Sequence, residues 1–358
     1  MKKLLSALVL VSVFLTGCVS NSYLSVTPHS SARAESTDAI TVENYHELRS
    51  ALVQQVDLHT TRFSMITYSY AGDVEADLAN AVDYVCHSYP IGAYAVQELE
   101  YDLAQVASYY QIEVSLTYSR SIWELEKIQE IRMENLDDAI SAALGASDGQ
   151  QVLMISAYRD TDFAAYCADY AARNPETVMQ TPAVTYSVWP DSGSVRIVEL
   201  HYAYVDTRYT LQQMRSQVDE ILSAADVYVG YGRTQAETVE LLHSFLAERF
   251  VYQPGTTDTP AYSMLCEGIS DSQTYAEIFR ILCQRAGITC YAVDGLKNGQ
   301  LYKWNILELD GRFYHADPYA AELAGLVQLP LYTDAEMTAY VWDQSAYPAC
   351  TAEQTTEE

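Results

Sequence analysis

The sequence predicts an α+β protein in which a helix packs on an antiparallel sheet, preceded by two small α+β units that repeat one another. Two Asx-Gly turns, Asn298-Gly299 and Asp310-Gly311, separate three β-rich runs and indicate an antiparallel meander. A helical pattern that begins near Ser272 comes just before this meander. Upstream, two stretches of about 90 residues share one order of helical and strand-like segments.

The repeat shows in the order of the elements and in the spacing of matching residues. Each unit opens with an acidic residue and an asparagine before a helical pattern, at Glu43-Asn44 and at Glu134-Asn135. Each closes with an alternating, tyrosine-rich strand, at 112–118 and at 198–204. The matching pairs are Glu113 with Glu199, Tyr118 with Tyr204 and Leu125 with Leu211. An α-β-α-β-β order in both stretches predicts two small units packed side by side.

These patterns divide the chain into six segments. A short helix near 216–222 and a Gly230-Tyr231-Gly232 turn mark the main domain boundary. The predicted segments are a signal peptide over 1–18, a flexible tether over 19–40, the first α+β unit over 41–132, the second over 133–229, a C-terminal domain over 230–350 and a disordered tail over 351–358.

The N-terminus has the pattern of an export signal. Lys2 and Lys3 precede an apolar run of about a dozen residues, too short for a hydrocarbon core that needs roughly 20. The run ends in Leu15-Thr16-Gly17-Cys18, which resembles a bacterial lipobox and implies a lipid on Cys18. We expect export and a lipid anchor on the outer face of the bacterial cytoplasmic membrane, or in the periplasm or outer membrane of a cell that has one. Secretion with cleavage after Ala34 is the alternative.

Charge and cysteine pattern exclude several classes of partner and cofactor. A formal charge of −28 repels phosphate polyanions, so nucleic acid is not an expected partner. The six cysteines beyond Cys18 permit disulfides in an exported protein, but the sequence leaves their pairing open. No CxxC or HExxH pattern occurs, so the sequence predicts neither a metal nor a cofactor.

From Thr234 a series of short motifs follows in a fixed order. They are Ala261-Tyr262-Ser263-Met264-Leu265, Glu267-Gly268, Tyr275-Ala276-Glu277, Gly287-Ile288, Trp304-Asn305, Leu309-Asp310-Gly311 and Tyr314-His315-Ala316-Asp317-Pro318. Over about residues 234–325 this series resembles bacterial transglutaminase-like domains, and the tail around Tyr340–Cys350 resembles the end of exported members. The resemblance implies a papain-like core, in which a helix lies on an antiparallel meander.

The same resemblance implies where catalytic residues would lie. The family has a cysteine at the N-terminus of the second helix, a histidine two residues before Trp-Asn, and an aspartate after the third strand. In this sequence the three positions hold Ser272, Tyr302 and Asp317. A serine hydroxyl without a base stays protonated, and tyrosine with a pKa near 10 is a poor base. The resemblance therefore implies a pseudoenzyme, with only the aspartate retained.

Three other side chains could in principle replace the lost groups. Cys266 lies six residues before the nucleophile position, and we expect it to be bridged or buried. Lys303 should point to the strand face opposite Tyr302, away from a serine–lysine dyad. His315 is expected to be structural. Ser272 itself is predicted to cap its helix.

Three functions follow as hypotheses. The leading one is a lipid-anchored surface protein whose inactive transglutaminase-like domain binds a peptide, a protein or a cell-wall component. The second is an acyl transferase or hydrolase that acts through Ser272 or Cys266. The third is a structural spacer in a cell-envelope assembly. In each case the expected membrane contact is the lipid on Cys18.

Overall fold

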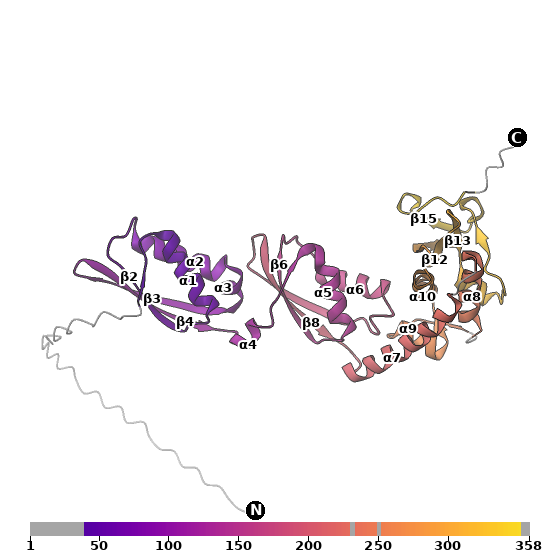
Figure 1. Cartoon of the computed structure of the whole chain (residues 1–358), viewed down its shortest axis with the longest axis horizontal. Coiled ribbons are helices and arrows are strands. Elements are labelled where there is room, and N and C mark those ends of the chain that lie inside the picture. Colours follow the sequence, from indigo (N-terminus) through magenta and orange to yellow (C-terminus); the bar gives the residue numbers. More distant parts are fainter. Residues whose placement is uncertain (1–38, 230–232, 249–251, 352–358) are drawn as a thin grey trace, which may run out of the picture.

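A computed structural model describes residues 39–229, 233–248 and 252–351, which form three bodies in a row (Figure 1). Helices and mainly antiparallel sheets alternate along the chain, so the predicted α+β class is confirmed. The predicted signal peptide with Cys18, and the predicted boundary turn at 230–232, lie outside the described residues.

The first unit is a four-stranded sheet with its helices on one face. Its elements are β1 (Ile40–Thr41), α1 (Tyr45–Asp57), β2 (Arg62–Thr67), α2 (Val74–His87), α3 (Pro90–Ala95), β3 (Val96–Val106) and β4 (Tyr109–Tyr118). The strand order is β1-β2-β4-β3. Asn44 caps α1 by accepting from the backbone N–H of Glu47, as its position before the helical pattern indicates. Leu48 and Leu52 of α1 pack against Met65 and Ile112 of the sheet.

The second unit repeats this topology. Its elements are α4 (Ile122–Leu125), β5 (Gln129–Arg132), η1 (Met133–Asn135), α5 (Leu136–Gly145), β6 (Gln150–Ser156), α6 (Phe163–Arg173), β7 (Ala183–Trp189) and β8 (Val195–Ala203). The strand order β5-β6-β8-β7 matches that of the first unit, so the predicted repeat is confirmed. The sequence pattern missed β1 and β5, because two to four residues are too few to show alternation.

The first unit packs onto the second through α3 and the chain that follows β4. Tyr94 and Ala95 of α3 lie against Val152 and Ile197, on the face of the second sheet that carries no helix (Figure 1). The Arg120 guanidinium also reaches this face. The two units therefore share a continuous apolar and ionic contact.

The C-terminal domain is built around a five-stranded antiparallel sheet of order β14-β13-β12-β11-β15. Its elements are α7 (Arg208–Ala224), η2 (Ala225–Tyr228), α8 (Gln235–Ala247), β9 (Gln253–Pro254), α9 (Pro260–Tyr262), η3 (Ser263–Glu267), β10 (Ile269–Ser270), α10 (Ser272–Arg285), β11 (Cys290–Lys297), β12 (Gln300–Leu309), β13 (Arg312–Ala316), α11 (Pro318–Leu323), β14 (Leu331–Tyr332), η4 (Asp334–Glu336), β15 (Tyr340–Trp342) and η5 (Gln344–Ala346). Helix α7 is longer than the predicted 216–222.

Helix α10 lies on one face of this sheet and carries most of the domain core. Tyr275, Phe279 and Leu282 are buried against Leu307 of β12. The helix ends as predicted at Gly287, whose left-handed conformation (φ 73°) is favourable for a residue without a Cβ. The helix-on-meander arrangement that the sequence predicts is therefore present. No helix among the described residues is long and apolar enough to cross a membrane.

The junction between α2 and α3 leaves no room for a side chain at Gly92. A Cβ built there would lie 2.1 Å from the carbonyl oxygen of Val85. We expect Gly92→Ala to lower the free energy of unfolding by about 1 to 3 kcal/mol, because the backbone must shift to relieve the overlap. Gly149→Ala is the control, since a Cβ at Gly149 meets nothing within 4 Å. Urea denaturation of both variants checks this, and equal stabilities would show that α3 is not closely packed.

Candidate functional site

The nucleophile position of the resemblance lies in the first turn of α10. Ser272 is 7% exposed, and its Oγ lies 3.4 Å from the backbone N–H of Lys303 on β12, from which it accepts a hydrogen bond. The prediction that Ser272 caps the helix is wrong. Asp271 holds that position in an extended conformation and accepts from the backbone N–H of Thr274 at 2.8 Å. A carboxylate is the stronger acceptor at the positive end of a helix dipole.

The residues at the expected positions of the base and of the aspartate that orients it are in direct contact. Tyr302 lies on β12, and Asp317 follows β13 and caps α11. The Tyr302 hydroxyl donates to Asp317 Oδ1 at 3.1 Å. Ser272 meets the same strand one residue further along, at the Lys303 amide. Ser272 of α10 therefore contacts the backbone of β12 next to Tyr302, and Tyr302 contacts Asp317. This contact gives the serine proton no route to the Tyr302 oxygen.

Asp317 is the centre of the arrangement. Its buried carboxylate accepts from the Tyr302 and Tyr340 hydroxyls, the latter at 2.6 Å, and from the Ala320 backbone N–H at 2.9 Å. Lys297 Nζ lies 2.9 Å from Asp317 Oδ2 and neutralises its charge. The ammonium also lies 4.6 Å and 4.9 Å from the centres of the Tyr302 and Tyr340 rings, within cation–π range. Four donors therefore surround the Asp317 carboxylate.

Tyr302 cannot serve as a base here. Burial raises the pKa of its hydroxyl above the usual value near 10, and the negative charge of Asp317 raises it further. Tyr340 shifts in the same direction for the same two reasons. Both hydroxyls stay protonated and donate to Asp317, and the Tyr302 oxygen also accepts from Lys297 Nζ at 3.5 Å.

Lys303 takes no part in a serine–lysine dyad. Its Nζ lies 2.8 Å from Glu277 Oε1 of α10 and 3.1 Å from Asp294 Oδ1 of β11. Burial alone would lower its pKa, but the two carboxylates outweigh that effect and the pKa of Lys303 is raised. The amine therefore remains charged. The Lys303 side chain bonds to α10, whereas the Tyr302 side chain points toward Asp317. This agrees with the prediction that the two side chains lie on opposite faces of β12.

The second proposed nucleophile, Cys266, lies apart from this arrangement. It belongs to the turn η3, and its side chain is half-buried. Strand β10 separates it from the start of α10.

His315 belongs to a different cluster that the sequence analysis did not find. The imidazole is fully buried on β13, and its Nε2 lies 2.9 Å from Asp334 Oδ1. The backbone N–H of Cys350 donates to the other oxygen of Asp334, at 3.1 Å. One ligand-type atom from each of His315, Asp334 and Cys350 lies within 4.8 Å of the other two. This is the residue set of a cysteine–histidine–aspartate triad, or of a three-ligand metal site.

The hydrogen bonds fit neither role. The Trp304 indole N–H donates to His315 Nδ1 at 2.9 Å, so Nε2 carries the single proton of the neutral ring and donates to Asp334. A metal on Nε2 would force a proton onto Nδ1, directly against the indole N–H. Burial, aided by Asp334, raises the pKa of the Cys350 thiol to about 12, so the thiolate is scarce at neutral pH. The cluster fastens the C-terminal segment to the sheet.

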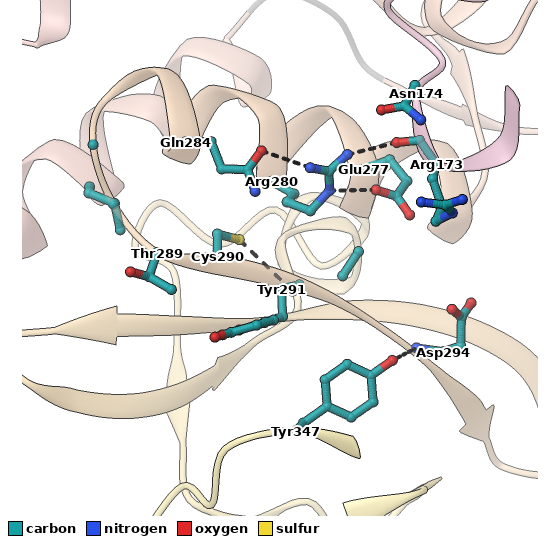
Figure 2. A pocket seen from close by; sticks show the side chains of 13 residues that line it. Arg173, Asn174, Glu277, Arg280, Gln284, Thr289, Cys290, Tyr291, Asp294 and Tyr347 are labelled. Atoms are coloured by element: carbon teal, nitrogen blue, oxygen red, sulfur yellow. Dashed lines mark hydrogen bonds and ion pairs between the residues drawn. The ribbon is translucent and has the colours of Figure 1, made fainter. Parts of the chain in front are cut away.

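Two hollows lie between the second unit and α10. The larger, of about 660 Å³, runs beside α10 and β11 (Figure 2). There Arg280 of α10 donates to the Arg173 carbonyl at 2.7 Å and pairs with Glu277, also at 2.7 Å. Tyr291 and Tyr347 line the opposite side. The smaller hollow, of about 180 Å³, lies at the N-terminus of α10.

Comparison with known proteins gives little similarity in sequence. No family model and no curated protein matches the chain. One similar solved structure is a transglutaminase, at 7% identity and a TM-score of 0.26, covering 60% of this chain and 63% of the other. Another is a candidate protease of Parabacteroides distasonis, at 9% identity and 0.24, covering 71% of this chain and 39% of the other. The chain spans less than two thirds of either, and the fold class rests on the helix and meander themselves.

We expect Asp317→Ala to lower the free energy of unfolding by at least about 2 kcal/mol. The substitution leaves the Lys297 ammonium and two tyrosine hydroxyls without their shared acceptor and removes the α11 cap. Asp258→Ala, at an exposed loop position, is the control and should change stability by less than about 0.5 kcal/mol. Urea denaturation measures both. Equal effects would contradict the central role of Asp317.

Stability should also fall as the pH drops below the usual histidine range. Burial lowers the pKa of His315 below the usual histidine value near 6.5, although the hydrogen bond and charge of Asp334 act in the opposite direction. At mildly acid pH the unfolded chain therefore binds more protons than the folded protein. The contribution of His315 to the free energy of unfolding is complete above about pH 6.5 and decreases below that pH, by at most about 1.4 kcal/mol per pH unit. His315→Gln should show a shallower loss between pH 7 and 5 than the wild type. His243, whose pKa is also lowered by burial, contributes equally to both proteins. Parallel curves would contradict this assignment.

Proposed function

We propose that the chain is an exported, lipid-anchored surface protein whose transglutaminase-like domain is a pseudoenzyme that binds a ligand without chemical change. One observation carries the loss of catalysis: the retained acid, Asp317, is saturated by Lys297, Tyr302, Tyr340 and the α11 backbone. A carboxylate that orients a catalytic base needs that base as its partner. Here its partners are donors that cannot accept a proton.

The neighbouring groups offer no substitute base for Ser272. Lys303 is held charged by Glu277 and Asp294, and His315 uses both ring nitrogens in hydrogen bonds to Trp304 and Asp334. Without a base the serine hydroxyl stays protonated and is a weak nucleophile. Acyl transfer or hydrolysis through Ser272 is therefore not supported.

The surroundings of α10 support ligand binding beside Ser272 and Asp317 rather than at these residues. Ser272 and Asp317 are 7% and 4% exposed, so little of either can meet a ligand. The hollow of about 660 Å³ is open and is lined by the exposed Asp294 carboxylate, the partly exposed Arg280 guanidinium, and the Tyr291 and Tyr347 rings. Mixed charges and amphipathic rings suit an extended polar ligand, such as a peptide or a cell-wall component.

The export pattern at the N-terminus supports the surface location. The lipobox at Leu15–Cys18 implies the anchor, and the strongly acidic composition argues against nucleic acid as a partner. A spacer role is the second candidate. It is favoured by the arrangement of the three bodies in a row, which holds the C-terminal domain away from the start of the first unit (Figure 1).

The pseudoenzyme proposal predicts that a thiol and a base must be restored together. Ser272→Cys alone supplies a thiol at a helix N-terminus, whereas Ser272→Cys with Tyr302→His adds an imidazole beside Asp317. Because nucleophile and base act as a unit, iodoacetamide labelling of position 272 at pH 6 should be at least roughly tenfold faster in the double variant than in the single one. Peptide mapping by mass spectrometry separates this position from the native cysteines.

Gln273→Cys with Tyr302→His is the matched control, since Gln273 is exposed on the same helical turn and should gain no comparable reactivity. The wild type should be inert in acyl-transfer and amide-hydrolysis assays. Turnover that Ser272→Ala abolishes would overturn the proposal, and turnover that Cys266→Ala abolishes would assign an active enzyme to a different nucleophile.

A further inference from the structure

The two α+β units have equivalent sheet faces on the side away from their helices. Each face has a glutamate at its centre, Glu113 on β4 and Glu199 on β8. In the first unit Glu113 lies between Ser64 of β2 and Asp102 of β3. In the second, Glu199 lies between Val152 of β6 and Ser187 of β7. Because the strand orders are also the same, what covers one face indicates what fits the other.

The face of the second unit is covered by the first unit. Arg120 Nη2 lies 2.6 Å from Glu199 Oε2, and the glutamate is only 3% exposed. The guanidinium also stacks 5.0 Å from the centre of the Tyr94 ring, which itself packs against Ile197. The side chains that cover this face are therefore an arginine and the aromatic ring beside it.

The same relation continues along the chain. Arg173, at the end of α6 in the second unit, offers its carbonyl to Arg280 of the C-terminal domain, and Met179 of the second unit enters that domain's core. Each unit thus contacts the next with the segment that follows its second long helix. The arrangement is head-to-tail, so the face of the first unit is the one not covered by a preceding unit among the described residues.

The face of the first unit is acidic and hollowed. It carries Glu98, Glu100, Asp102 and Glu113 together with Arg62. Two adjoining hollows, of about 530 and 920 Å³, cross it and share Arg62, Glu100 and Ser115 in their walls. Arg120, which pairs with Glu199, lines the larger hollow at the end nearest the second unit. Glu113 accepts from Gln111 Nε2 at 2.7 Å, and Asp102 lies directly opposite it on the adjacent strand. A further cation there would offset the repulsion between the two carboxylates.

The face of the first unit also differs from that of the second in having more polar side chains, which suit contact with solvent. In the second unit, Met154, Ile197 and Trp189 lie side by side across three strands. The equivalent positions of the first unit are Ile66, Gln111 and Ala104. Less apolar surface remains, while the central glutamate is retained. A partner would therefore bind through charge and hydrogen bonds more than through apolar burial, as in a reversible contact.

We propose that this face of the first unit docks a partner protein through an arginine presented beside an aromatic side chain, in the place that Arg120 and Tyr94 take on the second unit. Arginine fits better than lysine, because its planar guanidinium can bond two oxygens and stack on a ring. The site is separate from α10 and does not depend on whether the C-terminal domain binds a ligand.

The test is binding of a labelled peptide of alternating arginine and tyrosine to the full mature chain, followed by fluorescence anisotropy at low ionic strength. Asp102→Asn with Glu113→Gln should weaken binding at least roughly tenfold. Glu75→Gln with Asp83→Asn removes the same charge from the exposed surface of α2 in the same unit and should leave binding within about twofold. A peptide with citrulline in place of arginine keeps the shape without the charge and should not bind.

Three results would overturn the proposal. One is no binding of the arginine peptide at millimolar concentration. Another is equal weakening by the two double variants, which would mean attraction to net charge alone. The third is self-association of the free chain that Asp102→Asn with Glu113→Gln abolishes, because the face would then be an interface between copies. Thermal unfolding of each variant confirms that the fold is retained.

Discussion

The C-terminal domain depends on how the buried carboxylate of Asp317 is neutralised. A carboxylate at that depth is unfavourable unless charge and donors compensate it. Lys297 from β11, Tyr302 from β12 and Tyr340 from β15 all converge on it, and its own oxygen caps α11. A single side chain therefore links three strands of the sheet to the helix that follows.

That compensation allows a tyrosine at position 302 to lie beside a buried carboxylate. A tyrosine hydroxyl at position 302 keeps a hydrogen bond to Asp317. It brings no positive charge, and the Lys297 ammonium supplies that charge instead. The ring of Tyr302 also packs against Tyr319 and Tyr340, with ring centres 6.5 and 6.2 Å apart. The contacts of Tyr302 thereby join β12 to α11 and β15.

The head-to-tail contact between the α+β units also depends on the neutralisation of a buried carboxylate. Glu199 is buried because Arg120 comes from the preceding unit to neutralise it. The equivalent Glu113 lies on a sheet face with a net excess of acidic groups and fewer apolar side chains. One topology thus supports an interior joint in one copy and a solvent-facing surface in the other. The difference lies in a few outward-facing positions of three strands.

The positions Ser272, Tyr302 and Asp317 came from a family resemblance, whereas local sequence patterns were enough to predict the repeat, α10 and the meander. Each depends on a short-range signal: Asx-Gly turns, helical spacing or a glycine stop. Short edge strands such as β1 and β5 gave no such signal. The Asp271 cap was missed because serine and aspartate are both good caps, and only backbone geometry distinguishes them. The partners of Asp317 and the His315–Asp334–Cys350 cluster come from residues 15 to 35 positions apart along the chain. Their protonation and hydrogen bonding depend on burial, which only the tertiary structure decides, since it removes water and brings distant strands together.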